Sequence, residues 1–506
     1  MCDNNSNDIS RRDFLLKSSV LATSPVISAM PFGNTLTAAG NPAKDMLVGI
    51  QIPAVSFVDE GVNKVLDILQ EKGQVNTLFL TVFTYSGGAG GRQISGFPYP
   101  GHGKQEETFS FHGGNFATPH ARFYKNTALK DTKAPDFGNL DILEMVLPET
   151  KKRGMKVMPY LYDIWRRDTP NIDKLQEIDL DGNHAISCCA YNPEYKEFIK
   201  GLVADVTTSY GIDGLIWGSE HQGPFNNTIN GYFMREYDNV PTCFCTHHRK
   251  AAEAAGLNFS RVTEGYKKLL KFRIDSNEGK RPVDGYFVEF WRILMDYPEI
   301  LAYEKVWTDG HNGTYKSIYQ TAKGIRKDMR VGFHIWHNNS FHPFYRATQN
   351  FDRFAAYADF IKPVVYNVSA GGRYALYINN IGETIFKDLP KDELLKLNNY
   401  LLNYNDPMTM DELPKKGLSP EDYVSRETKR ALDQVKNTGC QVYPGIDVGI
   451  PMKQDKSVTP ADVYASTMAA LKAGANGLIF SRKYSEMTLE NLEAGGRAVK
   501  DFKNSV

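Results

Sequence analysis

The segment Tyr210-Gly-Ile-Asp-Gly-Leu-Ile-Trp217 decides the fold, because it returns near the end of the chain as Ala473-Gly-Ala-Asn-Gly-Leu-Ile-Phe480. In both copies a glycine that suits a helix C-terminus precedes a polar residue, a second glycine and a short apolar run. Such a run, bounded by turn residues, is typical of a buried strand. The two copies indicate one helix-to-strand junction used twice, and it lies at the wrong end of the strand for chemistry.

Short apolar runs rich in Val, Ile, Phe and Tyr recur along the chain and alternate with segments of helical periodicity, which favours parallel strand–helix units. The predicted strands cover residues 46–53, 75–85, 156–164, 211–219, 330–338, 359–367, 440–448 and 475–482. Amphipathic helices are predicted over 60–72, 194–209, 425–438, 459–473 and 488–502. Eight such units predict an α/β fold, the (β/α)8 TIM barrel. A doubly wound open sheet is the alternative, but Pro53-Ala-Val-Ser-Phe57 follows the first strand where a glycine-rich phosphate loop would stand.

The chain has 506 residues, more than the roughly 250 of an ordinary barrel. The surplus falls in three insertions, 86–140, 220–329 and 368–424, which follow the second, fourth and sixth predicted strands. The C-terminal ends of barrel strands carry the active site, so we expect these insertions to wall a cleft there. Residues 40–506 are therefore predicted to form one catalytic barrel.

The charge balance and the cysteine count argue against several classes of protein. Lys+Arg and Asp+Glu are both 59, so the chain has no net charge and no electrostatic case for binding nucleic acid or an anionic membrane. Six cysteines in this length are too few for a disulfide scaffold.

The N-terminus resembles a twin-arginine (Tat) export signal. Ser10-Arg-Arg-Asp-Phe-Leu-Leu-Lys17 precedes a weakly apolar run over 18–30, and Thr37-Ala-Ala39 offers a cleavage site. The run is too short to span a membrane. The resemblance implies that residues 1–39 are removed and that the mature protein is periplasmic.

Carboxylates follow three of the predicted strands. Glu220 stands just past an apolar strand, where partial burial would raise its pKa and suit a general acid. Asp447 ends the seventh strand and is the expected second carboxylate of a glycosidic hydrolysis, or else a structural Asp bonded to backbone N–H groups. Asp163, after the third strand, is a third candidate, although Arg166 or Arg167 could pair with it.

Aromatic and polar side chains at the same strand ends are candidates for substrate binding. His337, nearer the strand tip, is preferred over His334, because alternation lets only one of them face a given side of the strand. Aromatic rings suit sugar stacking, and hydroxyl, imidazole and guanidinium groups suit sugar hydroxyls or a charged substituent. The predicted substrate-binding residues are Tyr85, Trp217, His221, Trp336, His337, Tyr366 and Arg482.

The segment Cys243-Phe-Cys-Thr-His-His248 places two thiols and two imidazoles within six residues. Zn²⁺ accepts such ligands, but one residue rather than two separates the thiols. A disulfide with Cys188 or Cys189 and buried free thiols are the other interpretations. We expect no cofactor, with zinc as the alternative, and we expect Cys243 and Cys245 to brace the insertion without taking part in chemistry.

Asn192-Pro-Glu-Tyr195, the strand segment through Glu220, and Cys243-Phe-Cys245 together resemble uncharacterised barrel proteins called hypothetical glycosyl hydrolases. More distantly, the layout resembles the retaining glycosidase clan whose acid/base Glu follows strand four and whose nucleophile Glu follows strand seven. The resemblance implies that Glu220 is the acid/base. The chain departs from the clan at strand seven, which offers Asp447, and at Ser219, where the clan has Asn.

These observations predict an exported glycoside hydrolase acting on an oligo- or polysaccharide. The shorter Asp447 would widen the gap between the two carboxyl groups and favour inversion. Two alternatives remain: a metal-dependent sugar isomerase, lyase or hydrolase that uses His334, His337 or the cysteine–histidine segment, and a carbohydrate-binding barrel without catalysis.

Overall fold

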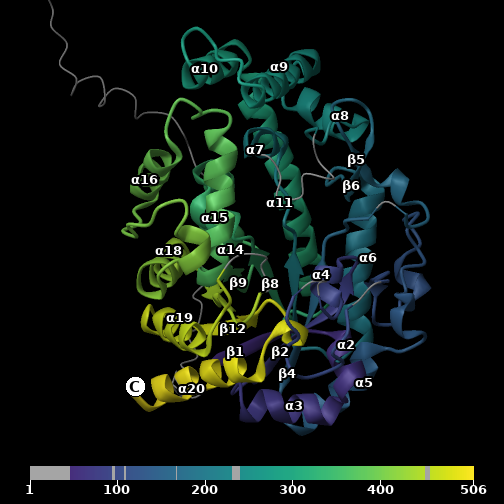
Figure 1. The fold of residues 1–506 in the computed structure, drawn as a ribbon. Helices are drawn as coiled ribbons and strands as arrows, with labels where there is room; N and C mark the ends of the chain where they lie inside the picture. The colour runs from purple at the N-terminus through teal and green to yellow at the C-terminus, as the bar shows by residue number, and fades with distance from the viewer. Residues whose placement is uncertain are drawn as a thin grey trace, which may run out of the picture. The chain divides into compact units, whose positions relative to one another are not determined.

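A computed structural model describes residues 46–93, 97–107, 110–166, 168–230, 240–450 and 456–505, which belong to one compact unit (Figure 1). The predicted export signal, residues 1–39, lies outside the described residues. None of the helices within the described ranges is both long enough and apolar enough to cross a membrane.

The core is one parallel sheet with a strand at each of the eight predicted positions. In chain order these are β1 (Leu47–Pro53), β2 (Thr77–Thr84), β4 (Lys156–Tyr162), β7 (Gly214–Gly218), β8 (Arg330–Ile335), β9 (Phe360–Pro363), β10 (Gln441–Val442) with β11 (Gly445–Asp447), and β12 (Gly477–Ser481). Each strand pairs with the next in this series, and β1 also pairs with β12. The predicted TIM-type α/β fold is confirmed.

The barrel closes at the seventh position, where one predicted strand is split in two. Pro444, which has no N–H to donate, interrupts the ladder between β10 and β11. β10 pairs with β9, β11 pairs with β12, and Gly445 bridges to Val364 just past β9. The split strand therefore joins both neighbours and completes the ring.

Alternation along the strands sorts their side chains between the barrel interior and the helical layer. The interior holds a separate apolar cluster of Leu47, Phe79, Met158, Tyr160, Ile216, Phe360, Tyr443 and Ile479. A Cβ at Gly332 would lie 2.1 Å from the Phe360 ring, so only glycine leaves room for that ring inside the barrel. The opposite faces of the same strands pack against the surrounding helices in the main core.

The helices around the barrel begin where the sequence supplies caps. Asp141 accepts hydrogen bonds from two backbone N–H groups of α5, Asn192 caps α6, and Thr459 forms a capping box with Asp462 at α19. The outer helices are α2 (Ala54–Glu60), α3 (Val62–Glu71), α5 (Ile142–Lys152), α6 (Pro193–Ser209), α14 (Phe351–Ala355), α18 (Ser425–Val435), α19 (Pro460–Lys472) and α20 (Leu489–Ser505).

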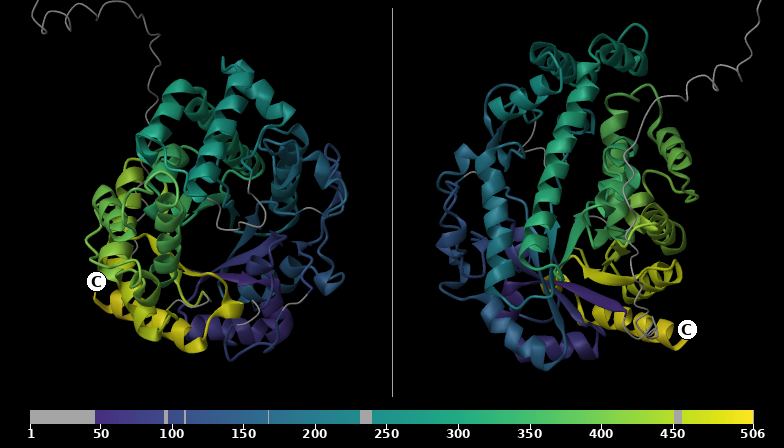
Figure 2. Two further views of the ribbon diagram at one scale, coloured as in Figure 1. Left: turned by 45° about the horizontal axis from the view of Figure 1, so that its top comes forward. Right: turned by 180° about the vertical axis from the view of Figure 1, so that it is seen from behind.

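The three predicted insertions carry structure of their own. The first contains α4 (Gly87–Gly90), β3 (Gly114–Asn115) and two 3-10 turns, η1 (Ala121–Phe123) and η2 (Pro135–Phe137). The second contains α7 (Pro224–Asn230), α8 (Thr246–Ala254), α9 (Phe259–Asn277), α10 (Tyr286–Asp296) and α11 (Glu299–Ile325). The third contains α15 (Asn367–Gly382), α16 (Lys391–Leu402), α17 (Leu413–Lys416) and η4 (Pro420–Val424). Helices α8, α9 and α10 gather at one end of the unit, opposite α3 and α20 (Figures 1 and 2).

The sequence did not predict a hairpin after the third barrel strand. β5 (Gln176–Ile178) and β6 (His184–Cys188) pair antiparallel there, preceded by η3 (Ile172–Lys174). Three short elements after the fifth and eighth strands complete the described structure: α12 (Asn338–Phe341), α13 (Pro343–Thr348) and η5 (Tyr484–Glu486).

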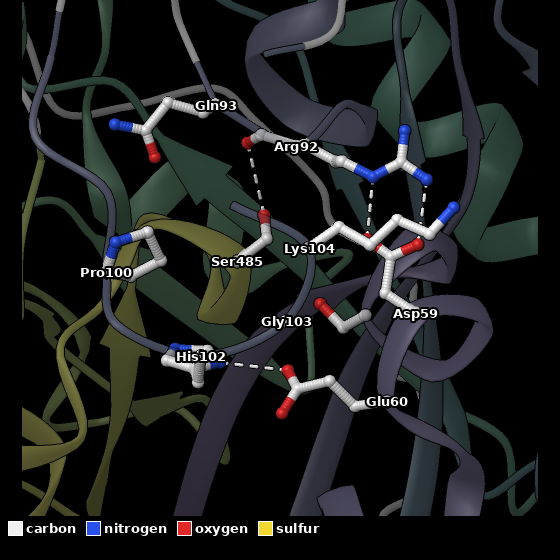
Figure 3. A pocket seen from close by; sticks show the side chains of 10 residues that line it. Asp59, Glu60, Arg92, Gln93, Pro100, His102, Gly103, Lys104 and Ser485 are labelled. Carbon is white, nitrogen blue, oxygen red and sulfur yellow. Dashed lines mark hydrogen bonds and ion pairs between the residues drawn. The ribbon is translucent and has the colours of Figure 1, made fainter. Parts of the chain in front are cut away.

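An arginine–aspartate ion pair and a histidine–glutamate contact hold the first insertion against α2 (Figure 3). Arg92 makes two hydrogen bonds to the Asp59 carboxylate, 2.6 and 2.7 Å long. Nδ1 of His102 lies 2.8 Å from Glu60, and its Nε2 lies 2.7 Å from the carbonyl oxygen of Met487. The bidentate Arg92–Asp59 pair fixes the direction of the arginine as well as its distance, so this part of the insertion is held at the barrel rim.

Candidate active site

A cleft of about 1240 Å³, open solvent included, lies at the C-terminal ends of the barrel strands. It is lined by Gln51, Ser86, Gly88, Ala89, Tyr162, Asp163, Trp165, Gly218, Glu220, His334, Trp336, His337, Tyr366, Arg373 and Arg482. Ser86, Gly88 and Ala89 come from the first insertion and Arg373 from the third. The expectation that insertions after barrel strands wall a cleft at this end is confirmed for these residues.

The floor of the cleft is made by the last inward-facing residues of several strands. The Gln51 amide donates to the Tyr162 hydroxyl at 2.9 Å and accepts from the Ser481 hydroxyl at 2.8 Å. A Cβ at Gly218 would lie 2.7 Å from the Tyr160 ring, so glycine is required for β7 to pass this ring. The barrel interior thus changes from apolar to polar as it opens into the cleft.

Glu220 lies in the cleft as a half-exposed carboxylate. Its side chain is 47% exposed, and Oε1 accepts a hydrogen bond from Nε2 of His334 at 3.1 Å. Burial raises the pKa of Glu220, but the His334 hydrogen bond and the charges of Arg373 and Arg482 outweigh it, so the pKa is lowered. The expected raised pKa is therefore wrong: cations and a donor surround this carboxylate, and they favour its ionised form.

Asp163 lies on the same wall in a different environment. Its Oδ1 accepts from the Tyr195 hydroxyl at 2.6 Å and the Ile164 N–H at 2.8 Å, and its Oδ2 accepts from the Ser219 hydroxyl at 2.7 Å. Burial raises the pKa of Asp163 despite these donors. The expected pairing with Arg166 is absent, because Arg166 bonds Asp168 and the carbonyl oxygen of His112 instead; Arg167 lies outside the described residues.

Asp447 does not line the cleft. Its carboxylate is 1% exposed and accepts backbone N–H groups from Ser369 at 3.1 Å, Gly449 at 3.3 Å and Ile450 at 3.2 Å. Burial raises its pKa. Both oxygens are committed to chain segments that leave the sixth and seventh strands, which corresponds to the structural interpretation of this residue.

Three of the predicted substrate-binding residues also lie outside the cleft lining. Trp217 points into the helical core, because its neighbours Ile216 and Gly218 take the inward positions of β7. Tyr85 packs in the same core, under the guanidinium of Arg166. His221 turns away from the cleft and lies 3.1 Å from the buried carboxylate of Glu177.

The other predicted binding residues, Trp336, His337, Tyr366 and Arg482, line the cleft. The preference for His337 over His334 is wrong, because β8 ends at Ile335, strand alternation does not reach His337, and both histidines line the cleft. The sequence did not indicate Arg373, which lines the cleft beside them. His334 faces inward at the end of β8, and its alternation with the flanking residues of the strand could have indicated this. Arg373 comes from α15, and its Nη1 is 3.1 Å from Nδ1 of His337.

A buried lysine stands below the cleft. Lys362 on β9 is 0% exposed, and its ammonium donates to Gln51 and, at 3.3 Å, to the Tyr366 hydroxyl. Burial lowers the pKa of Lys362 to about 7, against the opposing charge of Glu220. Lys362 therefore connects Gln51 and Tyr366, two residues of the lining.

The cysteine–histidine segment lies away from this lining. Within the described ranges, the one group of metal-ligating side chains found together is Cys189, Cys243, Cys245 and His248, and it includes neither His334 nor His337. All four are buried. The sulfurs of Cys189 and Cys245 are 3.5 Å apart, and the five described cysteines are free thiols.

No known protein family matches the sequence, and no curated protein matches it. Solved structures do. A β-galactosidase from the Antarctic haloarchaeon Halorubrum lacusprofundi aligns with a TM-score of 0.50 and 11% identity, over 90% of this chain and 58% of its own. An α-L-fucosidase from Paenibacillus thiaminolyticus aligns with a TM-score of 0.45 and 10% identity, over 90% of this chain and 49% of its own. The PgaB glycoside hydrolase domain from Bordetella bronchiseptica aligns with a TM-score of 0.42 and 10% identity, over 86% of this chain and 94% of its own. These structural neighbours are glycoside hydrolases, and the likeness to the first agrees with the barrel fold.

Proposed function

We propose that this protein is a glycoside hydrolase, exported by the Tat pathway, that cleaves an oligo- or polysaccharide with Glu220 and Asp163 as its working carboxylates. One observation carries the proposal: two carboxylates line a single cleft at the strand ends, and their surroundings displace their pKa values in opposite directions. Pairs displaced in this way are the arrangement that acid–base hydrolysis needs.

The pKa directions support a division of labour. Asp163, with its raised pKa, would protonate the departing glycosidic oxygen. Glu220, kept ionised by His334 and the nearby arginines, would attack the anomeric carbon or remove a proton from the attacking water. The acid/base role expected for Glu220 from its strand position thereby passes to Asp163.

The stereochemical outcome depends on the separation of these two carboxyl groups. About 5–5.5 Å suits a covalent intermediate and retention, and about 6.5–9.5 Å leaves room for water and inversion. The expectation of inversion was based on Asp447, which does not line the cleft. Asp163 follows β4, and β4 pairs directly with β7, the strand that Glu220 follows.

Aromatic and basic groups complete the proposed substrate site. Trp336, Trp165 and Tyr366 present rings to the cleft, on which sugar faces could stack. Arg373 and Arg482 add positive charge along the wall that carries Glu220.

The experiment is a screen of aryl glycosides and polysaccharides with the purified protein, followed by kinetics of Glu220→Gln and Asp163→Asn. We expect Asp163→Asn to lose about 10²–10⁴-fold in kcat/KM on substrates with poor leaving groups and to keep its kcat/KM on dinitrophenyl glycosides, whose leaving group needs no protonation. Glu220→Gln should be inactive on both.

Three outcomes would contradict the proposal. Equal losses in both variants on both substrate types would remove the division of labour. Sugar binding without turnover would favour a carbohydrate-binding barrel. Isomerase or lyase products would favour the metal-dependent alternative.

A further inference from the structure

Two thiols and one imidazole of the second insertion meet a third thiol from the segment after β6, outside the cleft. The ligand atoms of Cys189, Cys243, Cys245 and His248 all lie within 4.8 Å of one another. Sγ of Cys189 is 3.5 Å from Sγ of Cys245 and 3.1 Å from Nδ1 of His248, and Sγ of Cys245 is 3.8 Å from the same nitrogen. Zinc bonded at about 2.3 Å to sulfur and about 2.0–2.1 Å to nitrogen separates tetrahedral ligand atoms by about 3.5–3.8 Å.

Local structure explains how a segment with one residue between its cysteines forms this group. Cys245 is the N-cap of α8, and its sulfur accepts the backbone N–H of His248 at 3.5 Å. The N-cap and the third helical residue face each other across the first turn, so Cys245 and His248 converge. Cys243 lies in the segment that precedes α8 and runs beside β5, and its sulfur accepts the backbone N–H of Ile178 at 3.4 Å.

The fourth ligand comes from a distant part of the chain. Cys189 follows β6, the second strand of the hairpin that the sequence did not predict. Cys188 and Cys189 separate into different clusters: Cys188 packs in the main core, while Cys189 packs with Cys243 and Cys245. Of the two candidate partners, the structure therefore brings only Cys189 to the group.

We propose that Cys189, Cys243, Cys245 and His248 bind one Zn²⁺ ion in a structural site. Four protein ligands fill a tetrahedral shell and leave no position for water or substrate, which is typical of structural rather than catalytic zinc. All four side chains are buried and none lines the cleft. The proposal is independent of the hydrolase function, because it requires only metal binding.

The site would fasten the β5–β6 hairpin to the insertion that carries α8. Beside it, the buried Glu177 on β5 accepts hydrogen bonds from Ser187 at 2.9 Å and Thr242 at 2.8 Å, residues on the two segments that the metal would join. Ser187 also bridges to Trp165, which lines the cleft. Zinc would therefore stabilise the β5–β6 hairpin, which pairs with Trp165 of the cleft wall, without itself contacting the cleft.

Metal analysis of the purified protein tests the proposal. We expect one zinc per chain, and substitution by Co²⁺ should give the thiolate-to-cobalt charge-transfer band and tetrahedral ligand-field bands of a sulfur-rich site. Cys243→Ser and His248→Ala should lower zinc affinity by more than about 100-fold, since even partners of zinc ligands typically cost about 10–100-fold. Cys188→Ser and Cys440→Ser, which replace buried cysteines outside the group, are matched controls and should keep the zinc.

Should the ligand variants fail to fold, chelation and Co²⁺ reconstitution of the unaltered protein provide the test. Removal of zinc should lower the melting temperature, and re-addition should restore it. Three results would overturn the proposal: purified protein without stoichiometric zinc that also fails to take up Co²⁺, a Cys189–Cys245 disulfide identified in peptides, or equal zinc content in Cys243→Ser and the unaltered protein.

Discussion

Asp447→Asn tests whether this carboxylate is structural. The side chain is 1% exposed, and it accepts three backbone N–H groups, two on Oδ1 and one on Oδ2. In asparagine an NH₂ group replaces one of these oxygens. At best the amide oxygen takes the place of Oδ1, and the Ser369 N–H is then left facing another donor.

The magnitude follows from that count. A buried donor left without an acceptor costs about 1–3 kcal/mol. Burial raises the pKa of Asp447, so its ionised form is itself disfavoured in the folded protein, and a neutral amide recovers part of that cost. We therefore expect the free energy of unfolding to fall by about 1–2 kcal/mol, in the lower part of this range.

The assay combines urea denaturation with steady-state kinetics under conditions where the variant is fully folded. Asp433→Asn, at an exposed position on α18, is the matched control and should change neither quantity. Turnover per folded molecule should stay near that of the unaltered protein. Loss of turnover with an unchanged unfolding free energy would refute the reasoning and return Asp447 to the chemistry.

Two further predictions concern the cleft. His334→Ala removes the donor that helps to lower the pKa of Glu220, so the acid limb of the kcat/KM profile should move to higher pH; the same profile in both proteins would show that Glu220 does not set this limb. Trp336→Phe should raise KM because Trp336 lines the cleft, while Trp217→Phe, in the helical core, should lower stability and leave KM unchanged. The reverse pattern for the two tryptophans would show that the inward and outward faces of these strands are misassigned.

The barrel could be predicted from the sequence because each strand is a short apolar run bounded by turn residues. All eight positions were found. The break at Pro444 was missed, and the predicted strands 330–338 and 359–367 run past the observed ends of β8 at Ile335 and of β9 at Pro363. The β5–β6 hairpin was not predicted, because β5 has three residues and β6 five, too few to show a period. In the folded protein this hairpin places Cys189, the residue after β6, beside Cys243.

The site was only partly predictable, for a related reason. β7 is buried on both faces, so its apolar run does not indicate which residues point inward, and Trp217 was placed on the wrong side. Position at a strand end found Glu220 and Asp163 but also Asp447, because an aspartate that ends a strand can as readily accept local N–H groups as face a substrate. Arg373 belongs to a helix, where no strand pattern could reveal it.

Surroundings, more than position in the barrel, assign the roles of the two cleft carboxylates. Glu220 is half exposed and faces an imidazole donor and two guanidinium groups, so its negative charge is stabilised. Asp163 is buried, and neither its three neutral hydrogen-bond donors nor the charge of His221 offsets the loss of water, so its pKa is raised. A group that must carry charge and a group that must hold a proton need these opposite environments. We therefore assign the acid role to the buried Asp163. A substitution that places a cation beside Asp163 should lower its pKa and abolish this role.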